Sequence, residues 1–523
     1  MWRRLSSGSS SSRRSEAPCA SPVTTCSSRT GRRAAVGRSC CSLGTSMPLR
    51  KVWKTFWPAP ASSLTQAAVK AGCLDPQGRL PSSVKICECS SLTSQAWSGV
   101  STSHALSRPS DVSLQDQWGL SSPEKHYSQM KELHDRWRLS FVNRDYSVCP
   151  SYPPAVIVPK SADDEMLEKV AKFRQGGRFP VLCYYHRKNG TVIMRCSQPL
   201  TGANRKRCKE DEGLLQAAID GSDKGYIIDT RSTQQALQAR MTGGGGFESK
   251  SCYSNWKRLN RQMERGKALQ ESLIKLVEAC GDEYNNMDRW LSKLENSKWL
   301  SHVQTALSTA GLLAECVERD GHSVLVHGSE GTDSTLLIST LAQLIMDPCC
   351  RTLEGFLALL EREWVQAGHP FQQRCAHSAY SHSRLQQESP VFLLLLDCVW
   401  QLWRQFPLAL GFSEALLLRL ATEAYASDYG TFLCNSHQER CALGVTENTH
   451  CLFQALLRPR ERDCYSNPLY EPTELAIWPS VHPQSLQLWR GFFLRWTPQN
   501  RHLEEAQEEI RNMVIEWGKL AIS

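Results

Sequence analysis

Apolar residues recur along this chain with two different periods, one typical of strands and one typical of helices. Two apolar, strand-like runs flank the sequence Lys188-Asn189-Gly190, and Asn-Gly is a strong hairpin signal because both residues accept a positive φ. After Met287 the apolar positions fall three or four residues apart, as on one face of a helix: Trp290, Leu291, Leu294, Leu300, Val303 and Leu307. Another apolar helix is predicted where four leucines cluster: Leu416, Leu417, Leu418 and Leu420.

A further apolar run, residues 324–326, leads into a short turn and then into a helix-patterned stretch. The turn runs from Gly328 to Asp333, and the helical pattern begins at Ser334. A strand, a loop and a helix in this order point backbone N–H groups and a helix N-terminus at one spot, which suits a phosphate group. The residues of this candidate site are His327, Gly328, Ser329, Glu330, Gly331, Thr332, Asp333, Ser334 and Thr335.

Two other interpretations of this segment stand beside the phosphate loop. A nucleotide-binding loop ends in Gly-Lys-Ser/Thr, and the absence of any Lys between Gly328 and Thr340 argues against one here. The simpler alternative is a buried strand, a glycine turn and a buried helix with no relation to phosphate chemistry. The segment alone leaves that alternative open.

The first 115 residues differ in composition from the rest of the chain. From Met1 to Leu74 the only acidic residue is Glu16, while arginine and lysine recur in a background rich in serine. Such a segment cannot bury enough apolar surface to offset its ordering entropy, so residues 1–115 are predicted to be a disordered, basic leader, followed by a linker at 116–136. Its composition also fits a mitochondrial transit peptide, a contact with anionic membrane, or a solvated tail without a role.

Composition also argues against several classes of protein. The 22 cysteines form no Cys-x-x-Cys pair and follow no secretory signal, so free thiols in a reducing cytosol are expected, with no metal site and no cofactor. Cys375 lies near His369 and His377 in the sequence, but packing is the favoured interpretation because no oxyanion loop surrounds it. The net charge of +9 owes much to the leader, and no zinc-finger or aromatic-basic motif indicates nucleic acid binding. The richest apolar run, residues 391–399, is too short to span a bilayer and is interrupted by Asp397.

Long stretches between Trp137 and Pro498 resemble, in order and spacing, the myotubularin family of phosphoinositide 3-phosphatases. They include residues 137–140, 149–153, 178–182, 189–200, 227–231, 351–356, 397–401, 430–436 and 488–496. The family's signature loop reads His-Cys-Ser-Asp-Gly-Trp-Asp-Arg-Thr, and residues 327–335 fall on it. The resemblance implies an α/β, cysteine-phosphatase-like (myotubularin-type) domain over residues 137–498, with a central sheet flanked by many helices.

Two departures from the family loop remove its chemistry. The nucleophilic Cys falls on Gly328, and the phosphate-binding Arg falls on Ser334. In this chemistry a thiolate attacks phosphorus while the Arg holds two phosphate oxygens, and loss of a covalent nucleophile alone costs roughly six orders of magnitude in rate. Ser329 could be a substitute nucleophile, but the family already has Ser at that position and no base beyond His327 is evident.

The resemblance therefore implies a pseudophosphatase, an adaptor or regulatory partner that forms a heteromer with an active phosphoinositide 3-phosphatase of the family. The alternatives are a phosphoinositide-binding module without turnover and a residual phosphatase. Contact with a phosphoinositide or an anionic membrane is expected to be weak, because Glu330 and Asp333 stand in the loop without the clamping Arg. We expect a cytoplasmic protein, either soluble or peripheral on endomembranes. The lipid-binding domain of the pleckstrin-homology type with which family members usually begin has no recognisable counterpart before Trp137.

Residues 499–523 carry the pattern of a short partner helix. Apolar residues fall at heptad a and d spacing, with glutamates on the other faces: Leu503, Ala506, Ile510, Met513, Trp517 and Leu520. Fewer than three heptads is marginal for a free-standing coiled coil, so the helix either pairs with a partner or packs on its own domain. Family members often pair through a coiled coil after the phosphatase domain, and the resemblance adds weight to the first interpretation.

Overall fold

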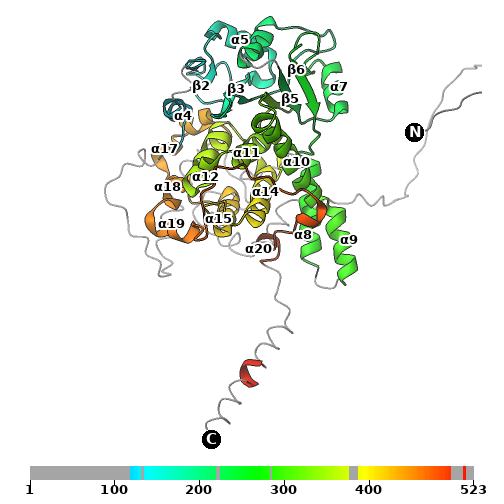
Figure 1. Ribbon diagram of the computed structural model, residues 1–523, viewed down its shortest axis with the longest axis vertical. Coiled ribbons are helices and arrows are strands. Elements are labelled where there is room, and N and C mark those ends of the chain that lie inside the picture. The colour runs from blue at the N-terminus through cyan, green and yellow to red at the C-terminus, as the bar shows by residue number, and fades with distance from the viewer. Residues whose placement is uncertain are drawn as a thin grey trace, which may run out of the picture. The chain divides into compact units, whose positions relative to one another are not determined.

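A computed structural model describes residues 118–130, 135–219, 224–282, 286–375, 387–495 and 510–513 (Figure 1). The predicted leader, residues 1–115, lies outside these ranges. Most of the predicted C-terminal helix also lies outside them, and only residues 510–513 of it are described, as helical and exposed. Both features therefore stay predictions.

A five-stranded mixed sheet, in the order β3-β4-β7-β5-β6, forms the centre of the domain. β3 pairs antiparallel with β4, and all other neighbours are parallel. The strands are β3 (Val181–Tyr185), β4 (Val192–Cys196), β5 (Gly225–Asp229), β6 (Trp256–Asn260) and β7 (Ser323–His327). Successive side chains on a strand point to opposite faces, so Val324 and Val326 join one apolar cluster while Leu325 joins the other. β7 is buried on both faces, as is usual for a parallel strand.

Two long helices cover one face of the sheet. α10 (Trp299–Glu318) and α11 (Ser334–Met346) contact each other and β7, and α14 (Val391–Gln405) packs against both helices (Figure 1). Because α11 is apolar nearly all round, it is buried on all sides. Smaller helices extend this layer: α8 (Lys267–Cys280), α9 (Met287–Ser297), η5 (Pro348–Arg351), α12 (Leu353–Leu360), the π-helix η6 (Glu361–Gln366), α13 (Phe371–Arg374), α15 (Glu414–Tyr425), α16 (His437–Ala442), α17 (Val445–Asn448), α18 (Leu452–Leu456), α19 (Pro459–Tyr465), η8 (Pro483–Ser485) and α20 (Arg490–Phe493).

Shorter elements cover the other face. A two-stranded antiparallel sheet lies beside β3, and helices α5 and α6 pack against each other. The elements are β1 (Trp137–Ser140), β2 (Val156–Pro159), α5 (Asp164–Phe173), η4 (Gln175–Gly177), α6 (Lys209–Ala218) and α7 (Thr233–Met241), which follows β5. The α/β class with a central sheet flanked by many helices is confirmed.

The predicted helical pattern after Met287 is confirmed, but it forms two helices. α9 ends at Ser297 and α10 begins at Trp299, and Lys298 between them has a φ of 59°. A positive φ interrupts a right-handed helix, which apolar spacing alone does not reveal. The predicted leucine-rich helix is confirmed as α15.

The predicted hairpin is confirmed, but its turn is longer than Asn-Gly suggests. Residues 186–191 connect β3 to β4, and of the Asn-Gly pair only Gly190 has a positive φ, 73°. Asn189 uses its side chain instead: Oδ1 accepts from Thr191 N at 3.0 Å, and Nδ2 donates to Val317 O at 2.8 Å. One of these side-chain bonds lies within the loop and the other reaches the end of α10, and together they hold the longer turn.

Residues 118–130 of the predicted linker at 116–136 pack on the domain. They include α4 (Pro123–Gln129), which begins at an N-cap where Ser122 Oγ accepts from Lys125 N at 3.2 Å, and which contacts β1 and β2. Trp118 Nε1 donates to Thr449 O at 3.1 Å, and Ser121 N donates to Glu361 Oε2 at 3.0 Å. These partners lie hundreds of residues away, so no local sequence signal announces them.

One carboxyl group is buried in the helical layer. Asp397 in α14 is fully buried, and its oxygens accept from Trp299 Nε1 at 2.7 Å and Gln401 Nε2 at 3.0 Å. Burial raises the pKa of Asp397 to about 6, although both hydrogen bonds lower it. No helix in the described ranges is long and apolar enough to cross a membrane, and the cysteines there are free thiols.

Replacing Trp299 with Phe should destabilise the domain in a pH-dependent way. A hydrogen bond to a buried charged group contributes roughly 1.5–3 kcal/mol, so a loss of about that size in the free energy of unfolding is expected at pH 8. The folded-state pKa of Asp397 already exceeds its unfolded value, so the wild type loses stability as the pH rises through about 6. Loss of the Trp299 N–H raises that pKa further, so the cost should be smaller at pH 5, where the carboxyl is protonated. Urea titrations at both pH values measure the difference.

Trp364→Phe is the matched control. Trp364 is as buried as Trp299, but its Nε1 donates to the neutral hydroxyl of Thr340, at 2.9 Å. The loss in the free energy of unfolding caused by Trp364→Phe should be the same at pH 5 and pH 8. An equally large Trp299→Phe penalty at both pH values would contradict an ionised Asp397 at pH 8.

Candidate functional site

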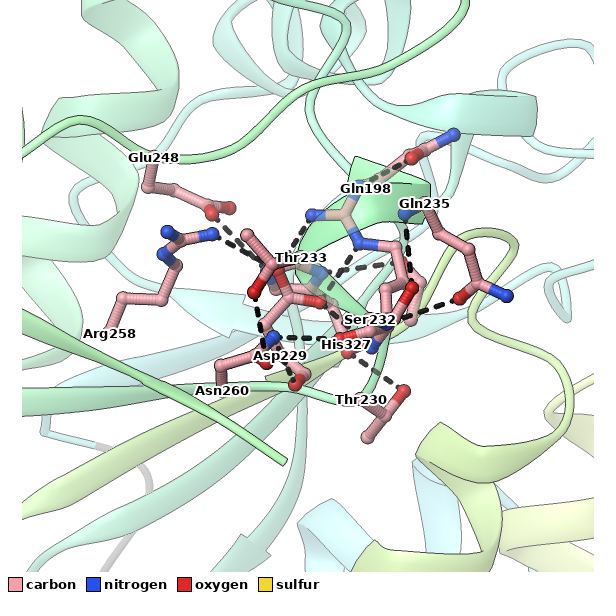
Figure 2. Close-up of polar contacts among 12 residues, drawn as sticks. Gln198, Asp229, Thr230, Ser232, Thr233, Gln235, Glu248, Arg258, Asn260 and His327 are labelled. Atoms are coloured by element: carbon pink, nitrogen blue, oxygen red, sulfur yellow. Dashed lines mark hydrogen bonds and ion pairs between the residues drawn. The ribbon is translucent and has the colours of Figure 1, made fainter. Parts of the chain in front are cut away.

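The parallel strands bring a row of polar residues to one edge of the sheet. In the strand register His327 of β7 is paired with Asp229 of β5 and Cys196 of β4, and Asp229 is paired with Asn260 of β6. These residues end their strands, and ligands of open α/β sheets bind outside the carboxyl ends of the strands. Figure 2 shows Asp229, Asn260 and His327 close together at this edge.

The predicted loop lies at this edge. β7 ends at His327, residues 328–333 form the turn, and α11 begins at Ser334. Gly331 has a φ of 75°, and a Cβ there would come within 2.5 Å of Cys196 O, so the turn requires glycine at this position. The strand, loop and helix order expected from the sequence is therefore present.

Hydroxyl groups crowd Gly328, the residue aligned from sequence with the family's nucleophile. A Cβ on Gly328 would lie 2.9 Å from Thr230 Oγ1 and 3.2 Å from Ser334 Oγ. Those two oxygens are hydrogen-bonded to each other at 2.7 Å and form what we call the Thr230–Ser334 hydroxyl pair. Ser334 is thus hydrogen-bonded to the same Thr230 hydroxyl that would crowd a side chain at position 328.

The loop is fixed from outside by its carbonyl groups. Ser329 O accepts from Gln198 N at 3.1 Å, and Gly331 O accepts from Arg178 Nη2 at 2.9 Å. Thr332 O lies 2.8 Å from His369 Nδ1. By contrast, no N–H of residues 328–333 has an acceptor within the part of the chain that the structure describes. The carbonyls are occupied while the N–H donors remain available.

An ion pair that the sequence did not predict compensates the acidic residues of the loop. Arg374 Nε and Nη2 donate to Asp333 Oδ1 and Oδ2 at 3.1 and 2.9 Å, and Nη2 lies 3.5 Å from Glu330 Oε2. Burial alone would raise the pKa of Asp333, but Arg374 and His369 outweigh it and hold that pKa below its usual value. Ser334 cannot supply a cation to Glu330 and Asp333, and Arg374 supplies one from a distant segment instead.

The imidazole of His327 is part of a buried polar network and is not free to act as a base toward the loop. Its Nε2 lies 3.2 Å from Glu248 Oε2, while Glu248 Oε1 accepts from Arg174 Nη1 at 2.7 Å. Arg174 also donates from Nε and Nη2 to both oxygens of Asp211, at 2.8 and 2.6 Å. Burial raises the pKa of Glu248, but His327 and Arg174 lower it far more. Ser329 Oγ has no hydrogen-bond partner among the described residues, so no base activates it there.

A second polar network lies beside the first (Figure 2). Arg231 donates from Nε and Nη2 to the two oxygens of Asp229 at 2.9 and 2.8 Å and from Nη1 to Gln198 Oε1 at 2.5 Å. Asn260 Nδ2 donates to Arg231 O at 2.7 Å, which connects the ends of β5 and β6. Polar residues directly after the apolar run 226–228 are the sequence signal that could have identified this network. Arg178, His369 and Arg374 carry no comparable local signal.

The remaining candidate chemistry is absent from the described residues. Cys375 is buried, and burial raises the pKa of its thiol above the usual value. Its backbone N–H donates to Phe371 O, no bond to His369 is present, and His377 lies outside the described residues. Nor do three or more His, Cys, Asp or Glu side chains gather there in a group that could hold a metal ion.

Replacing Arg374 with Gln should cost about 2 kcal/mol of stability at neutral pH, because it leaves the largely buried Asp333 carboxylate without its cation. The folded-state pKa of Asp333 is depressed, so this stabilisation is present above its unfolded pKa of 3.8 and is lost as the pH falls through the lower folded value. The gap between wild type and variant should therefore be largest near pH 7 and shrink below pH 4. Denaturant melts across this range measure it.

Lys267→Gln is the control for this substitution. Lys267 forms an exposed pair with Glu271 at 3.4 Å, and such pairs contribute less than about 1 kcal/mol. Adding Asp333→Asn to Arg374→Gln should recover part of the loss. A double variant less stable than Arg374→Gln alone would refute the proposed compensation.

Known proteins are similar to this chain in sequence. Residues 101–441 match the family described as the myotubularin-like phosphatase domain. Myotubularin-related protein 9 is 56% identical in mouse (Mus musculus) and 55% identical in human (Homo sapiens), each over 412 residues that cover 79% of this chain and 75% of the relative. Phosphatidylinositol-3,5-bisphosphate 3-phosphatase MTMR8 of chicken (Gallus gallus) is 37% identical over 384 residues, covering 72% of this chain and 60% of that protein. This chain belongs to the myotubularin family.

Proposed function

We propose that this chain is a pseudophosphatase, an adaptor or regulatory partner of active phosphoinositide 3-phosphatases of its own family. The observation that carries the proposal is the position of Gly328. Its missing side chain leaves no nucleophile, and the Thr230–Ser334 hydroxyl pair stands where a side chain at 328 would have to fit. The loop keeps its backbone course without the two groups that perform the reaction.

Electrostatics around the loop supports the same conclusion. Arg374 beside the loop is a candidate for a phosphate clamp, but its guanidinium is already bonded to Asp333, Glu330 and the carbonyl of Gln387. Catalysis of phosphoryl transfer relies on cations aimed at the developing charge of the transition state. A guanidinium committed to two carboxylates supplies little of that stabilisation.

The purified chain should release no phosphate from phosphatidylinositol 3-phosphate or the 3,5-bisphosphate. Gly328→Cys with Ser334→Arg should restore little activity, because a Cβ at 328 would lie 2.9 Å from Thr230 Oγ1. Adding Thr230→Ala removes this obstacle, so the triple variant should turn over faster than the double variant. A malachite-green assay measures phosphate release from all three proteins.

The controls for this assay address the residual-phosphatase alternative. Wild-type turnover that Ser329→Ala abolishes would make Ser329 a working nucleophile and overturn the proposal. Full activity of the Gly328→Cys, Ser334→Arg variant would show that the rest of the site is intact and that crowding by Thr230 is unimportant.

Binding of a phosphoinositide headgroup without turnover is the second candidate, and one observation favours it. The N–H groups of residues 328–333 lack acceptors in the described structure, and the buried Thr335 Oγ1 has no partner there either. Such donors at a helix N-terminus suit an anion. Saturable binding of phosphoinositide vesicles that persists after removal of residues 1–115 would favour this candidate over a pure adaptor.

The partner interface is proposed to include the C-terminal heptad pattern. On the turn of it that is described, Ile510 is 59% exposed and Met513 is 52% exposed, which leaves the a and d positions open to a partner. Asp at Ile510 and Trp517, or deletion of residues 503–523, should abolish co-purification with an active myotubularin. The melting temperature of the domain should change little.

Glu505→Ala with Glu508→Ala is the matched control, since both residues lie away from the a and d positions and from the flanking e and g positions of the heptad pattern. This variant should co-purify as the wild type does. If the Asp substitutions instead lower the melting temperature sharply and leave association intact, the helix belongs to its own domain and the interface lies on the phosphatase-like domain.

A further inference from the structure

A cavity of about 460 Å³ lies outside the degenerate loop. Its walls come from the end of α5, the segment after β4, the end of α7 and residues 247–253. No residue of the loop 327–335 lines it. Its volume falls in the range of cavities that hold small molecules, roughly 300–1,000 Å³.

Uncompensated positive charge surrounds this cavity. Arg207 is neutralised by Glu212, to which its Nε and Nη2 donate at 2.6 and 2.7 Å. Arg205, Lys206 and Arg240 also line the cavity, and none of them has a carboxylate partner within the described ranges. Clustered cations repel one another unless an anion lies between them. The lining therefore favours a ligand with more than one negative charge.

Backbone contacts hold these cations in place. Gly202 N donates to Gly245 O at 3.0 Å, and Lys206 N donates to Thr201 O at 2.7 Å. A Cβ on Gly246 would come within 1.7 Å of Thr201 Oγ1, so the glycine run and the basic segment are in close contact. Arg205 has a φ of 53°, which is uncommon for a residue other than glycine. The basic segment is thus a braced turn.

The rest of the lining adds aromatic rings and hydroxyl groups. Arg240 lies over the ring of Phe247, 5.5 Å from its centroid, so an aromatic face fixes this guanidinium where no carboxylate does. Tyr253 Oη donates to Asp211 Oδ2 at 2.6 Å, and that carboxylate is already paired with Arg174. Ser249 and Ser251 supply hydroxyls at the rim. The Asp211 carboxylate beside the lining and the Glu212 carboxylate in it are both paired with arginines, so neither opposes an anion.

We infer that this cavity binds a small polyanion that carries at least two phosphate groups. Arginine guanidinium groups form paired, charge-assisted hydrogen bonds with phosphate oxygens, and hydroxyls complete such sites. Three cations without carboxylate partners around one cavity match a ligand with several phosphate groups better than a ligand with a single phosphate group. The site is separate from the degenerate loop and independent of the proposed adaptor role. Free inositol polyphosphates and phosphoinositide headgroups share the required chemistry.

Alkylation of Cys252 in the full chain tests this inference, because Cys252 is a half-buried free thiol in the cavity wall. Peptide mass spectrometry follows its reaction with iodoacetamide, with the exposed thiols of Cys349, Cys441 and Cys464 as internal references. Inositol hexakisphosphate should slow alkylation of Cys252 by about tenfold and leave the references unchanged. Arg205→Gln with Arg240→Gln should remove this protection, since two charge-assisted contacts are lost and affinity falls by at least about tenfold.

Lys275→Gln with Arg289→Gln is the matched control. Both residues are exposed, neither has a carboxylate partner in the described ranges, and the change in net charge is the same. In this variant inositol hexakisphosphate should slow the alkylation of Cys252 as much as it does in the wild type. If the Arg205→Gln, Arg240→Gln protein fails to fold, Lys206→Gln is a second variant of the cavity. It too should reduce the protection of Cys252 by inositol hexakisphosphate.

Lipid vesicles distinguish a phosphoinositide headgroup from a free inositol polyphosphate as the ligand of the cavity. Protection by phosphatidylinositol 4,5-bisphosphate vesicles but not by inositol hexakisphosphate would support the site with a lipid headgroup as its occupant. Equal protection by phosphatidylserine vesicles, or by sulfate at the same ionic strength, would overturn recognition of phosphate groups. Unchanged alkylation with every probe, or protection that persists in the Arg205→Gln, Arg240→Gln variant, would overturn the site itself.

Discussion

The domain depends on one buried guanidinium. Arg174 has no exposed side-chain surface, and Asp211 and Glu248 hold it from two directions. Burial of three charges is costly unless every one of them is paired, and removal of one partner leaves an uncompensated ion inside the protein. Because Glu248 also contacts His327, this network fixes the end of β7 and therefore the start of the loop. The folded state needs the network whether or not the loop performs chemistry.

Together with the contacts to its carbonyl groups, that network sets the course of the loop independently of the side chains that the loop carries. Catalytic side chains reach into a site and can be replaced there, whereas Arg178 and Gln198 support the loop through its backbone carbonyls. The residues at 328 and 334, Gly and Ser, are small, and the Thr230–Ser334 hydroxyl pair lies beside them. The course of the loop is therefore compatible with different side chains at these two positions.

The sequence predicted the features that depend on local order. The loop after β7, the hairpin of β3 and β4, and the helices α10 and α15 follow from periodicity within a few residues. The features that it did not predict join distant segments. Arg374 lies 41 residues from Asp333, and Glu361 lies 240 residues from Ser121. Nothing in a linear pattern indicates which carboxylate a distant arginine will meet, so charge compensation in the loop and the docking of residues 118–130 emerged only in three dimensions.

The π-helix η6 carries a consequence for how the N-terminal part of the chain is attached. Both of its ends reach Ser121: Glu361 Oε2 accepts from the Ser121 N–H at 3.0 Å, and Gln366 Nε2 donates to the Ser121 carbonyl at 2.5 Å. In a π-helix the i and i+5 residues are joined in one turn, so the wider turn brings these two side chains to one backbone unit. η6 therefore holds the backbone of Ser121 with two side chains at once. Glu363 of the same helix contacts Arg195 at 3.1 Å, so one series of contacts connects Ser121 to strand β4 of the central sheet.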